Sequence, residues 1–352
     1  MAVVYIVSNN GKLAKDNELL EYSDYQGNIT KLLPQNTEQI VVVGVLDITG
    51  QAFALLSKWM IPITFLSKNG KYNSRLVFGD SKNVFLRHCQ HVLAEKPEFM
   101  LTMAKDIVRG KIHNEYLFMQ RVARQKGDAS IGEGVEKLAR LRTQLEQQGN
   151  DIETIRGIEG AAANAYFSLF AKTIQPDWAV FHGRSKNPPR DNVNAVLSFV
   201  YTLLATRIDG ILQQEGLDAG VGSLHAFAYG RDSLVFDLIE EYRSPLCDTL
   251  CCSLFNLAIL TPQDFRVADA DAEMDGIDSQ EMNTAGSCQA TLLTTDGMRK
   301  VLSQFEKKLL QTHIYPLDEK SYTYGTILKK QILLYKQVIG GILDHYMPLV
   351  VR

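Results

Sequence analysis

The chain of 352 residues has little that would mark a membrane, secreted or disulfide-rich protein. No run reaches the roughly 18 consecutive apolar residues of a membrane span. Residues 1–7 read as a strand and lack the basic start of a signal peptide. The five cysteines include no Cys-x-x-Cys pair, which favours buried reduced thiols over metal ligands or bridges. We therefore expect a cytoplasmic protein without membrane association.

The sequence also lacks the excess of positive charge that is typical of nucleic-acid-binding proteins, since its formal net charge is -3. Residues 264–281 carry seven acids and one base, a net -6 that leaves +3 for the rest of the chain. A mildly basic body remains compatible with a local basic surface. From Asp271 on, the segment loosely resembles a calcium-binding EF-hand loop. Such a loop ends with a glutamate at its twelfth position, whereas Glu281 is the eleventh residue counted from Asp271. This favours a solvated acidic loop.

The hydrophobic content of 45% indicates a packed protein, and its patterning changes once along the chain. Residues 1–78 favour strands, with turns expected at Asn9-Asn10-Gly11 and at Lys68-Asn69-Gly70-Lys71. Residues 79–84 form an expected linker. Helical periodicity dominates residues 85–352. We predict an α+β protein in which a small N-terminal β domain is followed by a larger all-α domain.

The helical region yields several definite predictions. After a first helical stretch that begins near Val84, helices are expected over residues 135–148, 151–172, 192–207, 232–242, 246–260, 298–311 and 321–346. A short helix is also expected at 51–59 in the β-rich part.

A candidate site surrounds His225, which precedes a Gly-Arg turn and the helix that starts at Ser233. At about 100° per residue, Asp237 and Glu240 fall opposite the apolar face of that helix. An imidazole and carboxylates that converge on one point could bind a divalent cation. The alternatives are a solvated acidic stripe and an ordinary loop or core histidine.

Two further segments carry candidate groups. Glu159 lies among glycine and alanine residues in 157–167, where tight packing would bury its carboxylate and require Arg, Lys or a metal as partner. A salt bridge or an exposed edge would explain it equally. The stiff loop 182–194 contains Arg184, Lys186 and Arg190, which could contact phosphates or simply be solvated.

In chain order, these segments resemble one family: protein one of the CRISPR system, the adaptation integrase described as a metal-dependent DNA endonuclease. The matching segments are 157–167, 184–204 and 224–245, together with Tyr322, Tyr324 and Gln331. The resemblance implies that Glu159, His225 and Glu240 are the metal ligands and that Asp237 is an accessory acid of the same site. The acidic stretch near 269–281 is longer than the family usually has there.

The resemblance also implies the function. With Mg²⁺ or Mn²⁺ as cofactor, a DNA 3′-hydroxyl would attack a phosphodiester to integrate a spacer, whereas attack by water would cleave DNA. Arg231 and the loop bearing Arg184, Lys186 and Arg190 would bind backbone phosphates. The expected partners are prespacer and repeat duplexes, a second copy of the chain that dimerises through the β domain, and CRISPR-associated protein two.

Three other classes remain open at this stage. They are a non-catalytic DNA-binding scaffold, a metal-dependent repair nuclease that acts on branched DNA, and an unrelated helical enzyme that uses His225 as a general base.

Overall fold

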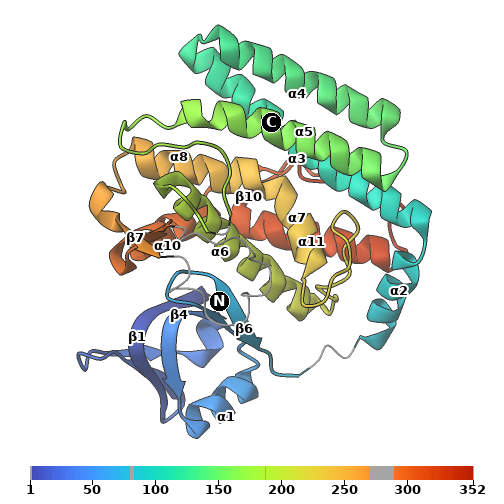
Figure 1. The fold of residues 1–352 in the computed structure, drawn as a ribbon. Coiled ribbons are helices and arrows are strands. Elements are labelled where there is room, and N and C mark those ends of the chain that lie inside the picture. Colours follow the sequence, from blue (N-terminus) through green and yellow to red (C-terminus); the bar gives the residue numbers. More distant parts are fainter. Residues whose placement is uncertain (1, 80–82, 187, 270–288, 352) are drawn as a thin grey trace. The chain divides into compact units, whose positions relative to one another are not determined.

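A computed structural model describes residues 2–79, 83–186, 188–269 and 289–351. The chain divides into two compact units, residues 1–82 and 83–352. Figure 1 shows the first as mostly β-strands and the second as mostly helices. The mixed α and β character predicted from the sequence is therefore present, while the boundaries drawn at residues 78 and 85 stay a prediction.

The first unit is built on one six-stranded sheet with the order β3-β2-β1-β4-β5-β6. β4 pairs in parallel with β1 and with β5, and the other neighbours are antiparallel. The strands are β1 Ala2–Asp16, β2 Leu19–Ser23, β3 Ile29–Leu32, β4 Thr37–Ile48, β5 Ile63–Leu66 and β6 Tyr72–Leu76. Helix α1, Gly50–Trp59, follows β4 and packs its Leu55 and Leu56 into the core of the unit.

The two predicted turns of this unit have different outcomes. The turn at 68–71 joins antiparallel β5 and β6, and Gly70 has the positive φ that such a turn requires. The turn at Asn9-Asn10-Gly11 is wrong, because β1 runs straight through it with a register shift between Ser8 and Gly11. Glycine allows this irregularity without a reversal of the chain. The Asn-Gly signal here marks a bulge-like feature.

The second unit holds the helices α2 Val84–Ala94, α3 Pro97–Lys126, α4 Ala129–Gln148, α5 Ile152–Phe170, α6 Asn192–Glu215, α7 Ser233–Tyr242, α8 Thr249–Asn256, α10 Thr295–Leu309 and α11 Tyr324–Ile339. The all-α prediction for residues 85–352 is wrong in detail. Two small antiparallel sheets pair β7, Phe265–Asp269, with β8, Gln289–Leu293, and β9, Thr312–Ile314, with β10, Ser321–Thr323. These strands are three to five residues long, too short for a periodic signal.

Helix boundaries follow the local capping chemistry. Asp151 and Asp191 accept hydrogen bonds from backbone N–H groups at the starts of α5 and α6, so both predicted starts were correct within a residue. The predicted helix 246–260 instead begins as a π-helical turn, η3, at Arg243–Asp248 that contains Pro245. Proline has no N–H to donate, which suits a locally widened turn. The predicted helix 321–346 ends at Ile339.

Helix α3 was not predicted as a separate element, because the helical stretch that begins near Val84 was given no end. Its 30 residues make it the longest helix of the described chain. It has clear end signals, with Pro97 in its first turn and Gly127 in the left-handed region at its C-terminus. Its buried face, however, includes Asp106, Lys111, Asn114 and Glu115. Charged residues at core positions hide the apolar period on which the prediction relied.

Helix α6 runs through the core of the second unit. In the described part of the chain, it is the one helix long and apolar enough to cross a membrane by length and composition, and 72% of the relevant window is buried within the protein. Such burial is typical of a core helix. The four described cysteines are all free thiols, as expected from their spacing, although Cys89 is exposed rather than buried. The possible calcium loop falls mainly on residues 270–288, outside the described residues.

Candidate metal centre

Three helices of the second unit bring the candidate site together. Helix α3 packs against both α5 and α7, and Figure 1 shows α3, α4 and α5 as long neighbouring helices. Glu159 lies on α5 and Glu240 on α7, and their carboxylates meet at the side chain of Lys111 on α3. The site is therefore assembled from three segments, the first and last of which lie 129 residues apart in the sequence.

Lys111 is the residue that joins the two carboxylates. Its Nζ donates a hydrogen bond to Glu159 Oε1 and lies 2.8 Å from Glu240 Oε2. The side chains of Lys111 and Glu240 are 3% and 2% exposed, whereas Glu159 is 26% exposed. The cluster is thus buried at Glu240 and opens toward solvent at Glu159. A salt bridge was the alternative considered for Glu159, and this structure contains one.

Glu240 is held ionised inside the protein. Burial raises the pKa of its carboxyl, but the charges of Arg243 and Lys111 outweigh burial and lower the pKa to about 2. Arg243 Nη2 lies 3.1 Å from Glu240 Oε1, three residues further along the chain. A buried carboxylate with two cationic neighbours is an anionic ligand at any physiological pH.

Asp237 organises the loop that carries His225. Its carboxylate accepts hydrogen bonds from the backbone N–H groups of Ser223, Leu224 and His225. Asp237 Oδ1 also lies 2.7 Å from His225 Nδ1. Gly222 permits this wrapping, because a Cβ there would lie 2.9 Å from Asp237 Oδ2. The contact assigns the ring proton to Nδ1 and leaves Nε2 as the nitrogen for a ligand.

The structure rejects a solvated stripe as the explanation of α7. Asp237, Glu240 and Glu241 are all buried. The predicted polar face of the helix is turned into the protein, where each carboxylate has specific partners. Asp237, with no exposed area and four protein donors around it, stands behind His225 and orients it.

The predicted ligands do not form a ready-made cage. Within the described ranges, no three His, Cys, Asp or Glu side chains are close enough to hold one ion as they stand. The residues nevertheless fit a hard divalent cation, because two carboxylates already converge on one positive charge. Glu240 Oε2 is a buried oxygen that receives no well-aligned hydrogen bond from the described residues. His225 is the third predicted ligand, and the carboxylate of Asp237 behind it orients its ring.

Arg184, a predicted DNA contact, is committed to the protein. Its guanidinium donates to the Ser185 carbonyl, to Asn194 Oδ1 at 2.8 Å and to Ser198 Oγ at 3.1 Å. It also lies over the ring of Tyr201. These contacts fix the loop to the start of α6. The side chain therefore has a structural task that the sequence pattern did not reveal.

The other predicted DNA contacts have exposed side chains. Lys186 and Arg190 extend from the same loop, and Arg231 lies over the ring of Phe236 near the start of α7. Desolvation together with the positive charges of Arg243 and Arg184 lowers the pKa of Lys186, while Glu240 acts in the opposite direction. Lys186 is thus electrostatically close to the carboxylate cluster.

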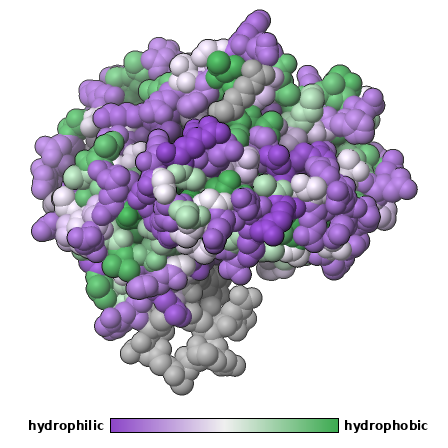
Figure 2. Space-filling view, turned by 90° about the horizontal axis from the view of Figure 1, so that it is seen from above, coloured by the Kyte–Doolittle hydropathy of each residue, from purple (hydrophilic) through white to green (hydrophobic). Residues whose placement is uncertain are grey.

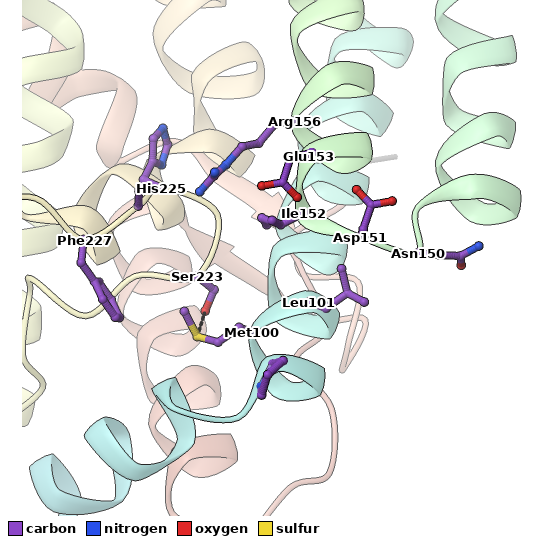
Figure 3. Close-up of a pocket in the computed structure, with 12 residues that line it drawn as sticks. Met100, Leu101, Asn150, Asp151, Ile152, Glu153, Arg156, Ser223, His225 and Phe227 are labelled. Atoms are coloured by element: carbon purple, nitrogen blue, oxygen red, sulfur yellow. Dashed lines mark hydrogen bonds between the residues drawn. The ribbon is translucent and has the colours of Figure 1, made fainter.

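A pocket of about 470 Å³ lies beside His225. Figure 3 shows Met100 and Leu101 on one side, Phe227 on another, and Glu153 and Arg156 from the start of α5. Arg156 donates to the Leu224 carbonyl and so links α5 to the loop that holds His225. The pocket provides space next to the imidazole at the solvent side of the site.

The C-terminal tail, residues 343–351, forms hydrogen bonds with helices α3 and α7. Glu241 accepts hydrogen bonds from Tyr346 Oη, from the Leu349 backbone N–H and from Gln331 Nε2. Asn114 on α3 donates to the Glu241 and Leu349 carbonyls. The tail therefore packs against the turn of α7 that carries Glu240 and Glu241.

A model of the family described as CRISPR associated protein Cas1 matches residues 4–307. The chain belongs to this family. The family predicted from the sequence motifs is confirmed.

Curated Cas1 relatives match over nearly the whole chain. The CRISPR-associated endonuclease Cas1 3 of Thermus thermophilus is 33% identical and covers 100% of this chain and 98% of its own. The CRISPR-associated endonuclease Cas1 1 of Chlorobaculum tepidum is 29% identical, with 99% and 98% covered.

Solved structures share the Cas1 fold. The Cas1 protein TM1797 of Thermotoga maritima has a TM-score of 0.78 at 21% identity, with 97% of each chain covered. A casposase bound to integration product has a TM-score of 0.81 at 20% identity, with 100% of this chain and 95% of that chain covered. A chain of a Cas6-RT-Cas1–Cas2 complex, of which 36% is covered, has a TM-score of 0.81 at 21% identity.

Proposed function

We propose that this Cas1 chain is a divalent-metal-dependent DNA endonuclease and integrase of CRISPR adaptation. It would insert short spacers of foreign DNA into a CRISPR array by attack of a 3′-hydroxyl on a phosphodiester. The observation that carries the proposal is the convergence of Glu159 and Glu240 on one cation, beside a histidine oriented by Asp237. The naming of its relatives as endonucleases and the integration product held by a structural neighbour support the same reaction.

Glu159, Glu240 and His225 Nε2 would hold Mg²⁺ or Mn²⁺. The ion would supply Lewis-acid activation and neutralise the charge that develops at phosphorus. Asp237 keeps the proton on Nδ1, so that Nε2 would be the unprotonated nitrogen that holds the ion. The greater exposure of Glu159 leaves room for a phosphodiester on that side of the cluster.

Basic side chains next to the cluster would bind the DNA backbone. Lys186, Arg190 and Arg231 are exposed and supply charge without base-specific geometry, which gives salt-sensitive binding independent of sequence. Arg184 would act indirectly, by fixing the loop from which Lys186 and Arg190 extend. Figure 2 shows a mostly hydrophilic surface on the side of α4, with hydrophobic residues in scattered small groups.

The proposed partners are prespacer and repeat DNA duplexes, a second copy of this chain that associates through residues 1–78, and CRISPR-associated protein two. The similarity to a chain of a Cas1–Cas2 complex supports the last of these. The proposed location is the cytoplasm, where the array is found. Light scattering that gives only the monomer mass of 39.4 kDa at micromolar concentration would contradict the dimer.

The test is an integration assay with a short duplex bearing a free 3′-hydroxyl and a supercoiled plasmid that carries a repeat. Joined products should require Mn²⁺ and should disappear in the Glu159→Ala and His225→Ala variants, while DNA binding is mostly retained. Glu136→Ala, an exposed carboxylate on α4, serves as the control. Undiminished joining by Glu159→Ala at saturating metal would reject the assignment. Cleavage without joining would favour a repair nuclease, and metal-independent binding alone would favour a scaffold.

A further inference from the structure

Lys111 stands where two metal ligands meet, and the sequence motifs did not single it out. Its ammonium is paired with Glu159 and with Glu240, and its side chain is only 3% exposed. Two carboxylates within ion-pair distance stabilise the charged form of this buried amine. Lys111 is thus a permanent positive charge at the centre of an acidic cluster.

Two carboxylates buried side by side need positive charge between them, whether or not a metal ion is present. Arg243 also contacts Glu240, but only Lys111 among the described residues is paired with both glutamates. A divalent ion bound by the same carboxylates would face a positive charge within a few ångströms, in a region of low dielectric constant. Lys111 and the ion therefore compete for the same negative charges.

A third carboxyl group is available to the same lysine. Glu115 lies four residues further along α3, on the same helix face as Lys111, and is buried. Its Oε2 is buried and has no hydrogen-bond partner in the part of the chain that the structure describes. An oxygen of Glu115 is therefore available to accept a hydrogen bond from Lys111 when the ammonium turns away from Glu159 and Glu240.

We propose that Lys111 is a built-in counter-ion, which pairs Glu159 with Glu240 in the metal-free protein and is displaced when a divalent ion binds. It acts as a positioning residue, since it keeps the two ligands together before the ion arrives and lowers the affinity for the ion by competition. The inference rests on the metal-binding role proposed for Glu159 and Glu240. It adds a regulator of that role within the fold.

The test compares Mn²⁺ binding to the full chain without DNA, by calorimetry and by the shift of the melting temperature between EDTA and Mn²⁺. Lys111→Met should melt earlier than wild type in EDTA, bind Mn²⁺ about tenfold more tightly and show a larger upward shift with Mn²⁺. Lys111→Arg should restore wild-type behaviour, because it restores the charge. Lys105→Met, on the same helix but bonded to the Glu146 carbonyl, is the matched control and should leave Mn²⁺ affinity unchanged.

Unchanged or weaker Mn²⁺ binding by Lys111→Met would overturn the inference. The proposed function is tested separately by Glu159→Gln, which should abolish Mn²⁺ binding. If wild type binds Mn²⁺ and Glu159→Gln does not, a failure of Lys111→Met to tighten binding rejects only the counter-ion. If wild type binds no Mn²⁺, both proposals fail.

Lys111→Met could fail to fold, so the wild-type protein provides an independent measurement. Brief acylation with acetic anhydride, read by mass spectrometry, reports how strongly each lysine amine is protected. Labelling of Lys111 should rise when Mn²⁺ is added, relative to Lys105 as an internal reference. Equal labelling of Lys111 with and without Mn²⁺ would overturn displacement.

Discussion

Asp237 accepts four hydrogen bonds from a single loop, three from backbone N–H groups and one from the ring of His225. A carboxylate in this position does two jobs. It compensates the buried N–H groups of the loop, and it determines which imidazole nitrogen is unprotonated. Both roles direct the oxygens of Asp237 toward the loop that carries His225.

Asp237→Asn should therefore weaken Mn²⁺ binding and integration by about 10–100-fold, the range found when a partner behind a metal ligand is removed. The amide also presents an N–H₂ group to backbone donors, which should lower the free energy of unfolding by about 1–3 kcal/mol. Metal titration and urea unfolding measure the two effects. Asp47→Asn, an exposed residue of the first unit, is the control. Full activity in Asp237→Asn would show that the orientation of His225 is set elsewhere.

Glu241 should give the protein a measurable pH dependence. Burial raises the pKa of its carboxyl to about 7, although hydrogen bonds from Tyr346, Leu349 and Gln331 act in the opposite direction. Because the folded-state pKa lies above the unfolded value, the folded state binds the proton more tightly. Stability should therefore fall as the pH rises from about 4.5 to about 7, by about 3 kcal/mol from this group.

Urea unfolding near pH 5 and near pH 8 checks the effect. Glu241→Gln should flatten the decrease, while Glu136→Gln, an exposed glutamate, should leave it unchanged. Parallel curves for wild type and Glu241→Gln would assign the pH dependence to other buried acids, such as Asp248, whose pKa burial raises to about 6.

At the scale of elements, Asp248 ties three segments together. It lies at the end of the π-helical turn η3 and accepts hydrogen bonds from Tyr166 on α5, at 2.7 Å, and from Tyr201 on α6, at 2.6 Å. The rings of Tyr166 and Tyr201 are buried around it, and Arg243 lies over Tyr201. This network holds η3, and with it Arg243, against the helix that carries Glu159.

Tyr166→Phe and Tyr201→Phe should each cost about 1–3 kcal/mol of unfolding free energy, because each leaves one oxygen of a buried carboxyl unpaired. The double variant should cost less than the sum, since Asp248 can then remain protonated. A double-mutant cycle by urea unfolding measures the coupling. Tyr25→Phe, an exposed tyrosine, is the control, and strict additivity would contradict a shared network.

The sequence predicted elements well where local chemistry decides. Asp151 and Asp191 marked the starts of α5 and α6 because an N-cap needs only a side chain and the next turn of backbone. Helix α3 was not recognised as a separate element, because its core-facing positions include Lys111 and Glu115. The burial of these residues depends on charges brought from α5 and α7. A hydrophobic period cannot report tertiary ion pairs.

The prediction of the site had the same limit, because local motifs identify residues but do not report contacts between distant segments. Glu159, His225 and Glu240 were predicted as metal ligands from the order of motifs along the chain, and the structure brings the two glutamates to one point. Lys111 was not predicted as part of the site, because helix α3, which carries it, was not recognised as a separate element. Arg184 was taken for a DNA contact because composition cannot distinguish a solvated arginine from one that donates to Asn194 and Ser198.

For the whole molecule, the exposed basic residues predict how DNA binding responds to salt. Lys186→Ala and Arg190→Ala should each reduce the slope of log affinity against log salt by about one, without a preference for any DNA sequence. Fluorescence anisotropy across a salt series measures the slope. Lys329→Ala, an exposed lysine on α11, is the control. An unchanged slope in both loop variants would place the DNA elsewhere.

The tail supplies a last prediction. Truncation after Met347 removes the Leu349 N–H from Glu241 and the Val351 N–H from Asn114. Both partners are buried, so the loss should be about 1–3 kcal/mol and should weaken Mn²⁺ binding through α7. Urea unfolding and metal titration check this. A truncated chain with wild-type stability would show that the tail only covers α3.

The position of the tail has a consequence for synthesis. Lys111, Glu159, His225 and Glu240 emerge from the ribosome long before residues 346–351, which complete the hydrogen bonds of Glu241 beneath them. Until residues 346–351 have left the ribosome, Glu241, the neighbour of Glu240 on α7, lacks the hydrogen bonds from Tyr346 and from the Leu349 N–H. The proposed metal centre should therefore reach its final packing only after residues 346–351 have been made, although its own residues are translated much earlier.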